Sequence, residues 1–116
     1  MRPPVPIEDI EQIQFVEYLD LKRLKYTAIP NSTFTRSWKV KNRNKAMGLH
    51  GGLPDILVIV KRWLVFIEMK RQRGGVVSDK QREWIKAINE TENGKAYVAK
   101  GSEEAIKIIE TLLCSS

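Results

Sequence analysis

Asp55, Glu68 and Lys70 are the residues of this sequence whose types and spacing could do chemistry. Asp55 follows a proline, and Glu68 opens the triplet Glu68-Met69-Lys70 at the end of an apolar run. Between residues 21 and 75 the chain carries thirteen lysines and arginines, and these two residues are the only acids there. Carboxylates are the hard oxygen ligands that Mg²⁺ or Mn²⁺ prefers. The pattern therefore indicates a cation site for phosphodiester hydrolysis within a surface that binds a polyanion.

A predicted hairpin would bring these three side chains together. Two runs rich in β-branched and aromatic residues, 56–60 and 63–69, flank a short polar break. A turn centred on that break places Asp55 opposite Glu68, with Cβ atoms about 4.5–5.5 Å apart. Lys70 lies two residues beyond Glu68 and therefore projects from the same face. Two facing carboxylates repel unless a cation lies between them, so the hairpin favours a metal site.

Each residue also has an ordinary structural explanation. Asp55 could cap a turn after Pro54, and Glu68 and Lys70 could be charges at the end of a strand. The combination is the stronger signal, because a lysine beside a metal ion can orient or deprotonate the attacking water, or stabilise charge on the phosphate.

The elements that would position these residues follow from periodicity and capping. The first helix carries an apolar stripe of Phe15, Val16 and Leu19 that extends backwards to Gln12 and Glu8. Ser78 opens a capping box before a later helix. The predicted elements are a helix at 7–24, strands at 26–30, 56–60 and 63–69, a helix from 78 to about 90, a strand at 96–99 and a helix at 102–113.

These elements predict one α/β domain over residues 1–116, in the order α-β-β-β-α-β-α, with a mixed sheet flanked by helices. The chain has a net charge of +6, one cysteine and no apolar run of membrane-spanning length. We expect no signal peptide, no disulfide within the chain, no contact with a membrane and a cytoplasmic location.

The basic segment after residue 35 has no apolar periodicity, so we expect a basic ribbon or a loop there. Trp38 favours core packing over stacking on a base, and His50, among glycines, favours a loop position over a ligand role. The predicted contacts to DNA phosphates are Arg36, Lys39, Lys41, Arg43, Lys45, Arg71 and Arg73.

Pro54-Asp55 followed by Glu68-Met69-Lys70 resembles the signature of the PD-(D/E)xK nucleases. The wider sequence is similar to their VRR-NUC (virus-type replication-repair nuclease) branch over nearly the whole chain. The matching segments are Glu8-x-x-x-Gln12 with Tyr18-Leu19, Ile29-Pro30-Asn31, Ala46-Met47-Gly48, Gly52 to Leu57, Phe66 to Lys70, Ser78-x-x-Gln81-x-x-Trp84 and Gly101 to Ala105.

This resemblance implies a restriction-endonuclease-like core and a catalytic site. Mg²⁺ or Mn²⁺ would be held by Asp55, Glu68 and the carbonyl of Met69, with Lys70 as the catalytic lysine. Glu8 matches the family's acid on the first helix, with Glu11 as a rival one turn away. Gln81 matches a family glutamine, although its place in the capping box explains it equally well.

The resemblance further implies a homodimer that cuts branched DNA, such as a Holliday (four-way) junction, in the manner of stand-alone phage or prophage resolvases. Two other readings remain open. One is a basic DNA-binding module that keeps a nuclease fold without catalysis. The other is a restriction-type or RNA-processing nuclease on the same scaffold.

Overall fold

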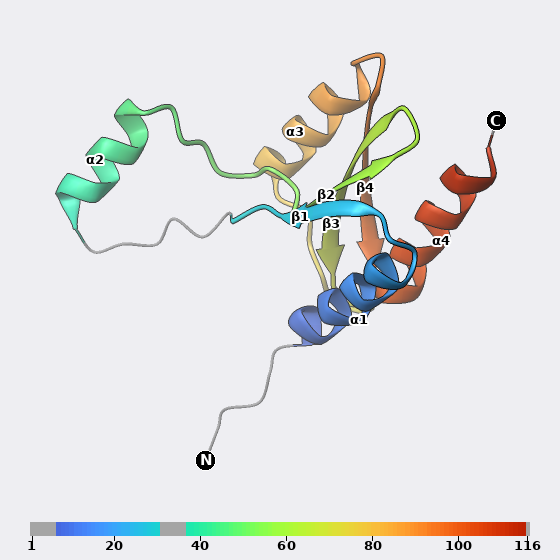
Figure 1. Cartoon of the computed structure of the whole chain (residues 1–116). Helices are drawn as coiled ribbons and strands as arrows, with labels where there is room; N and C mark the ends of the chain where they lie inside the picture. The colour runs from blue at the N-terminus through green and yellow to red at the C-terminus, as the bar shows by residue number, and fades with distance from the viewer. Residues whose placement is uncertain (1–6, 31–36, 116) are drawn as a thin grey trace.

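The computed structural model describes residues 7–30 and 37–115, with side chains from Asp9 onward. Its elements, shown in Figure 1, are α1 (Ile7–Leu21), β1 (Lys25–Ala28), α2 (Trp38–Ala46), β2 (Ile56–Val60), β3 (Trp63–Lys70), α3 (Asp79–Asn89), β4 (Gly94–Lys100) and α4 (Ser102–Cys114). The predicted α/β class with a mixed sheet flanked by helices is confirmed. The predicted order lacked one helix, α2.

The four strands form one sheet in the order β1-β2-β3-β4. The pairs β1–β2 and β2–β3 are antiparallel, whereas β3 and β4 are parallel and are joined by α3 as a crossover helix. In the β2–β3 hairpin Ile56 lies opposite Ile67 and Val60 lies opposite Trp63. The predicted register is therefore confirmed for β2 against β3, and the ladder ends with Ile56 opposite Ile67, so Asp55 lies just beyond it.

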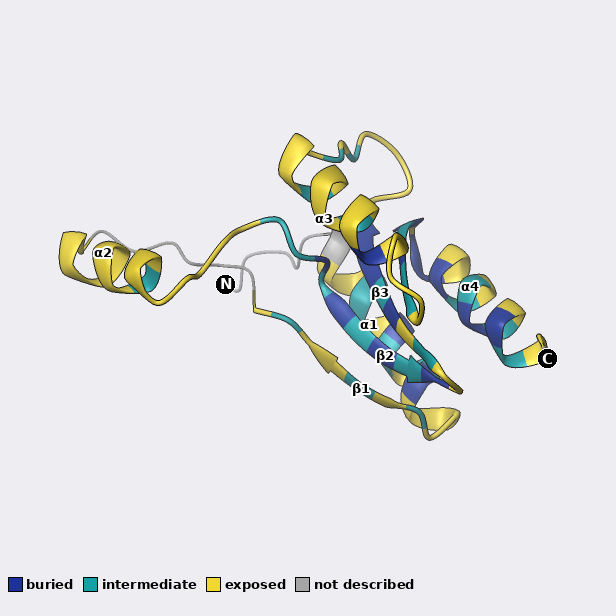
Figure 2. Cartoon of the chain, turned by 90° about the horizontal axis from the view of Figure 1, so that it is seen from above, coloured by how far each residue is buried: buried dark blue, intermediate teal, exposed yellow. Residues whose placement is uncertain are grey.

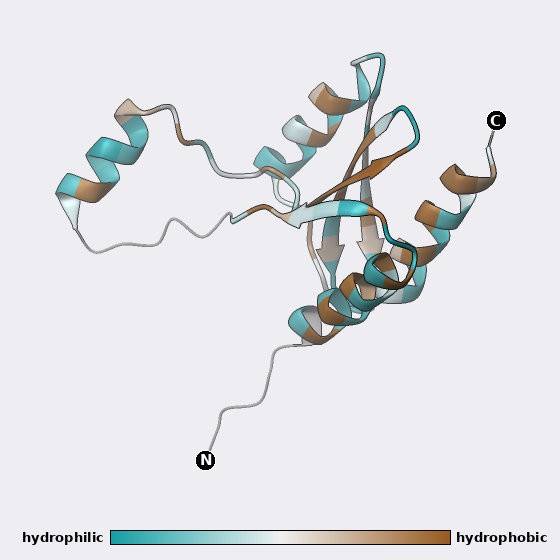
Figure 3. Ribbon diagram, viewed as in Figure 1, coloured by the Kyte–Doolittle hydropathy of each residue, from teal (hydrophilic) through white to brown (hydrophobic). Residues whose placement is uncertain are grey.

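The sheet has one face against α1 and α4 and the other against α3 (Figure 1). Phe15 and Leu19, one turn apart on α1, are fully buried against the first face. Every second residue of β2 and of β3 joins them in the core. These residues are Ile56, Val58, Val60, Val65, Ile67 and Met69. Figure 3 shows the same hydrophobic concentration on β2 and β3. The intervening residues of the two strands point to the opposite face, and Glu68 of β3 therefore faces α3.

The segment expected to be a ribbon or loop contains α2, and this expectation was wrong. None of the nine helical residues is buried, and α2 stands apart from the sheet (Figures 1 and 2). The helix lacks an apolar stripe, so periodicity could not reveal it. Its local signals are at the ends: Ser37 accepts a hydrogen bond from the Val40 N–H, and Arg43 and Lys45 lie in the last turn, where the helix dipole favours cations.

Trp38 was expected in the core, and this was also wrong. Its side chain is 75% exposed, and the Lys41 ammonium lies 5.4 Å from its ring centroid. Because α2 makes almost no contact with the sheet, nothing can bury its first residue. His50 does lie in a loop, as predicted.

Other predicted boundaries differ by a few residues. The first helix ends at Leu21 instead of residue 24, because Arg23 adopts a φ of +57°. Strand β1 ends at Ala28, before Pro30. Within residues 7–30 and 37–115 there is no helix with both the length and the apolar character needed to cross a bilayer.

Candidate active site

The carboxyl end of β3 and the residue before β2 bring Asp55, Glu68 and Lys70 together. The Asp55 backbone N–H donates to the Ile67 carbonyl (3.1 Å), although Ile67 lies opposite Ile56, so the pairing shifts by one residue at Asp55. The Asp55 Oδ2 atom accepts a hydrogen bond from the Met69 N–H at 2.8 Å. The Lys70 Nζ atom lies 3.5 Å from Glu68 Oε2. The three side chains thus share one patch on the α3 side of the sheet.

Glu68 is the unusual member of this patch, because it is a buried carboxyl with only 3% of its surface exposed. Burial, and then the negative charge of Asp55, raise the pKa of Glu68 to about 7, although Lys70 acts in the opposite direction. Its Oε1 atom is buried and has no hydrogen-bond partner among the described residues. An orphaned buried oxygen is costly unless something coordinates it.

A hard cation would satisfy that oxygen. Asp55 and Glu68 offer carboxylate oxygens, and a cation between them would relieve both their repulsion and the burial of Glu68. Among the described side chains no group of three or more His, Cys, Asp and Glu is placed to hold a metal. Mg²⁺ keeps several waters and needs only one or two protein carboxylates, so this donor set fits Mg²⁺ or Mn²⁺.

Gln81 makes two sets of contacts, one within the capping box of α3 and one with Glu68. Its Oε1 atom accepts the Ser78 N–H (2.9 Å) and its backbone N–H donates to Ser78 Oγ (3.2 Å), which completes the capping box of α3. Its Nε2 atom donates to Glu68 Oε2 at 3.0 Å. The start of α3 is therefore tied directly to the buried carboxylate.

Glu11 is buried, but its contacts lie away from this patch. Its Oε1 atom accepts from Gln72 Nε2 (3.0 Å), and its Oε2 atom accepts from the Ser102 N–H. The Ser102 hydrogen bond is the main reason why the pKa of Glu11 is lowered. Helix α4 begins after Gly101, which has no side chain to cap it, and Glu11 supplies that cap from α1. Glu8, the predicted first-helix acid, has its side chain outside the described residues.

Glu11→Ala is expected to lower the free energy of unfolding by about 2 kcal/mol, because it removes a helix cap and a part-buried hydrogen bond to Gln72. Urea unfolding at neutral pH measures this change. Glu17→Ala is the matched control, since Glu17 is an exposed acid on the same helix. Equal stability of the two variants would contradict the capping role.

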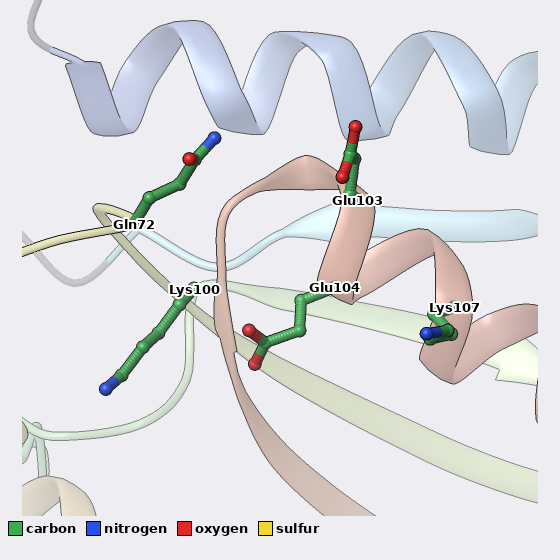
Figure 4. A pocket seen from close by; sticks show the side chains of 5 residues that line it. All are labelled: Gln72, Lys100, Glu103, Glu104 and Lys107. Carbon is green, nitrogen blue, oxygen red and sulfur yellow. The ribbon is translucent and has the colours of Figure 1, made fainter.

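A cavity of about 420 Å³ lies beside the Glu11 contacts and is shown in Figure 4. Its lining residues are Gln72, Lys100, Glu103, Glu104 and Lys107. In Figure 4 the Gln72 side chain points toward α1, in agreement with its hydrogen bond to Glu11. Two cations and two acids surround this cavity, so its charge does not favour a polyanion.

The predicted DNA contacts fall into two groups. Lys39, Lys41, Arg43 and Lys45 lie on α2 and are exposed, whereas Arg71 and Arg73 follow β3. Arg36 lies outside the described residues. In the loop after α2, the Gly51 carbonyl accepts a hydrogen bond from the indole Nε1 of Trp84 on α3 at 3.1 Å. This contact joins residues 33 positions apart, so neither periodicity nor capping rules could predict it.

Comparison with known proteins places the chain in a family. The family model of the VRR-NUC domain matches residues 9–103. A solved structure described as a VRR_NUC domain protein is 25% identical, with a TM-score of 0.68, over 96% of this chain and 91% of that chain. No curated protein matches at a significant level. With its mixed sheet, flanking helices and full-length structural match, this chain belongs to the VRR-NUC family of nuclease domains.

Proposed function

We propose that this protein is a metal-dependent endonuclease that hydrolyses phosphodiester bonds in branched DNA, in particular four-way junctions. The observation that carries the proposal is the buried Glu68 carboxylate, whose orphaned oxygen lies in one patch with Asp55 and Lys70. Structural charges at a strand end would be solvated, whereas this carboxylate is held out of water at the cost of a raised pKa.

The metal would be held by Asp55, Glu68, the Met69 carbonyl and Glu8. When bound, Mg²⁺ or Mn²⁺ supplies an acidified water and neutralises charge on the phosphate. The Asp55 carboxylate is held in place by the Met69 N–H, so the two acids have a fixed separation. Rigid placement of this kind removes the need to reorganise the site during the reaction.

Lys70 and Gln81 act from the two sides of Glu68. The Lys70 ammonium, 3.5 Å from Glu68 Oε2, is placed to orient water or to stabilise negative charge that develops on the phosphate. The Gln81 amide donates to the same Glu68 oxygen and holds the carboxylate in place, which leaves the Oε1 atom for the metal. Lys70 is the proposed catalytic residue, and Gln81 is a positioning residue.

DNA would lie along the basic residues of α2 and the segment after β3. Most of these cations are on an exposed helix without apolar anchors, so they fit the phosphate backbone better than base edges. Recognition by shape suits a branched substrate. A homodimer would supply two equivalent sites, as cutting two strands of a junction requires.

The test compares cleavage of a labelled four-way junction with cleavage of a linear duplex of matching sequence, in Mg²⁺, in Mn²⁺ and in EDTA. We expect junction-selective cutting with either metal and none in EDTA. Binding without cutting in all three conditions would contradict the proposal and favour the non-catalytic DNA-binding module. Equal cutting of junction and duplex would support nuclease activity but contradict the proposed selectivity for branched DNA.

A further inference from the structure

A second hollow, of about 320 Å³, lies between the end of α2 and the start of α3. Its cations are Lys41 and Lys45 from α2 and Lys80 from the first turn of α3. Asn44 and His50 add polar groups, and none of the described residues that line it is an acid. We call these three lysines and His50 the basic pocket.

The loop that forms one wall of the basic pocket is fixed to α3. Trp84 Nε1 donates to the Gly51 carbonyl at 3.1 Å. Gly52 has a φ of +102°, and a Cβ added there would lie 3.0 Å from the Lys80 backbone. The loop can rest this closely on α3 because residue 52 is a glycine. The relative positions of Lys80 and the wall are therefore set by packing.

The charges of the basic pocket favour an anion. Lys41 and Lys45 are four residues apart on one helix, so their side chains are neighbours and repel each other. Lys80 adds a third positive charge from a different element. No described lining acid offsets these charges, which distinguishes the basic pocket from the cavity of mixed charge near Glu11. A phosphate group would relieve the repulsion and accept hydrogen bonds from all three ammonium groups.

The basic pocket is connected to the candidate active site through α3. Lys80 immediately precedes Gln81, whose amide donates to Glu68 Oε2. The residue that would hold the anion, Lys80, is therefore next in the chain to the residue that positions the buried Glu68 carboxylate. Lys80 and Gln81 are consecutive residues in the first turn of α3, so the helix backbone fixes the spacing between the two positions.

We propose that the basic pocket binds a single backbone phosphate of the nucleic acid, on the flank of the phosphate that is hydrolysed at Glu68. This proposal rests on the proposed nuclease function and adds to it a discrete anchor with Lys80 as its central residue. The anchor sets which phosphodiester bond enters the active site. The reason is that the first turn of α3 carries both Lys80 of the basic pocket and Gln81, which contacts Glu68.

The test measures DNA affinity as a function of salt concentration, in EDTA so that no DNA is cut. It uses the labelled junction with wild type, Lys41→Gln, Lys80→Gln and the double variant. Each phosphate contact adds about 0.9 to the slope of log affinity against log salt. If the lysines share one phosphate, each single variant loses up to about 0.9, and the double variant loses no more than about 0.9 in total. Lys107→Gln, an exposed lysine on α4, is the control and should leave the slope unchanged.

His50 provides a second, local readout, because it is the only histidine in the chain. Its ring signals in an NMR spectrum should move when a short oligonucleotide is added to wild type. In the double variant at saturating DNA they should stay in place. This readout reports occupation of the basic pocket independently of cleavage.

Three results would overturn the basic pocket. They are unchanged slopes in the lysine variants, a loss well above about 0.9 in the double variant, and His50 signals that do not move when DNA is added. If wild type still cleaves the junction in Mg²⁺, any of these leaves the proposed function intact. Wild type that binds no DNA would overturn both proposals. Binding through the basic pocket without cleavage would contradict the proposed nuclease activity and leave the basic pocket as a phosphate-binding site.

Discussion

Glu68→Gln is expected to reduce junction cleavage by about three orders of magnitude or more, while DNA affinity stays within a few-fold of wild type. The substitution keeps the size of the side chain and an oxygen that can accept from Gln81. It removes the negative charge of the Glu68 carboxylate, which a divalent cation held with Asp55 needs. Loss of one preorganised electrostatic group in an active site costs roughly 10²–10³-fold, and loss of the metal costs more.

Single-turnover cleavage in saturating Mg²⁺ measures the effect on the chemical step, and binding in EDTA measures affinity. Glu83→Gln is the matched control, because Glu83 is an exposed acid on α3 that makes no contact with Glu68 in the described structure. Cleavage by Glu68→Gln within threefold of wild type would show that the metal and the chemistry lie elsewhere.

The metal-free protein is expected to lose stability as the pH rises from about 4.5 to above 7. The pKa of Glu68 is raised from an ordinary value of 4.5 to about 7, so the folded state binds this proton more tightly than the unfolded state. Stability therefore falls with rising pH across that window, since the unfolded state binds fewer protons. The shift corresponds to about 3 kcal/mol at pH 8.

Urea unfolding in EDTA at pH 4, 6 and 8 measures this loss, with Glu68→Gln as the reference that lacks the titrating carboxyl. The difference between the two proteins should be small at pH 4 and should grow to about 3 kcal/mol in favour of the variant at pH 8. Added Mg²⁺ should stabilise wild type increasingly as the pH rises, because the metal takes the place of the proton. A constant difference from pH 4 to pH 8 would contradict the burial of an ionisable Glu68.

Local rules made the hairpin and the capping box predictable from the sequence. The side-chain period of two and the turn between residues 60 and 63 fix the register of β2 against β3, and this register brings Asp55, just before β2, to the carboxyl end of β3. Lys70 then follows on the same face. Ser78 and Gln81 are three residues apart, so their mutual hydrogen bonds also depend only on local geometry.

The pairing of Glu11 with Ser102 was not predictable in the same way. The two residues are separated by 91 positions in the chain, and their contact exists only because α1 and α4 pack on the same face of the sheet. The helix pattern placed Gln12 and Glu8 on the core-facing stripe, whereas the buried acid is Glu11. The rival assignment of Glu11 as a metal ligand arose from this limit.

Helix α2 shows the opposite failure, since its formation is local but its hydrophobic pattern is absent. Periodicity detects a helix through the face that it buries, and α2 buries none. Only the Ser37 cap and the basic last turn marked it. Its distance from the sheet also left Trp38 exposed, which a rule based on residue type could not anticipate.

The sequence by itself determined which acids and which lysine share one strand face, because strand periodicity and a short turn act over about fifteen residues. Only the tertiary structure decided that Glu68 is buried with an orphaned oxygen, and that Lys80 of α3 meets Lys41 and Lys45 of α2. The reason is that burial and charge clustering depend on which elements pack together, and that packing joins residues far apart in the chain.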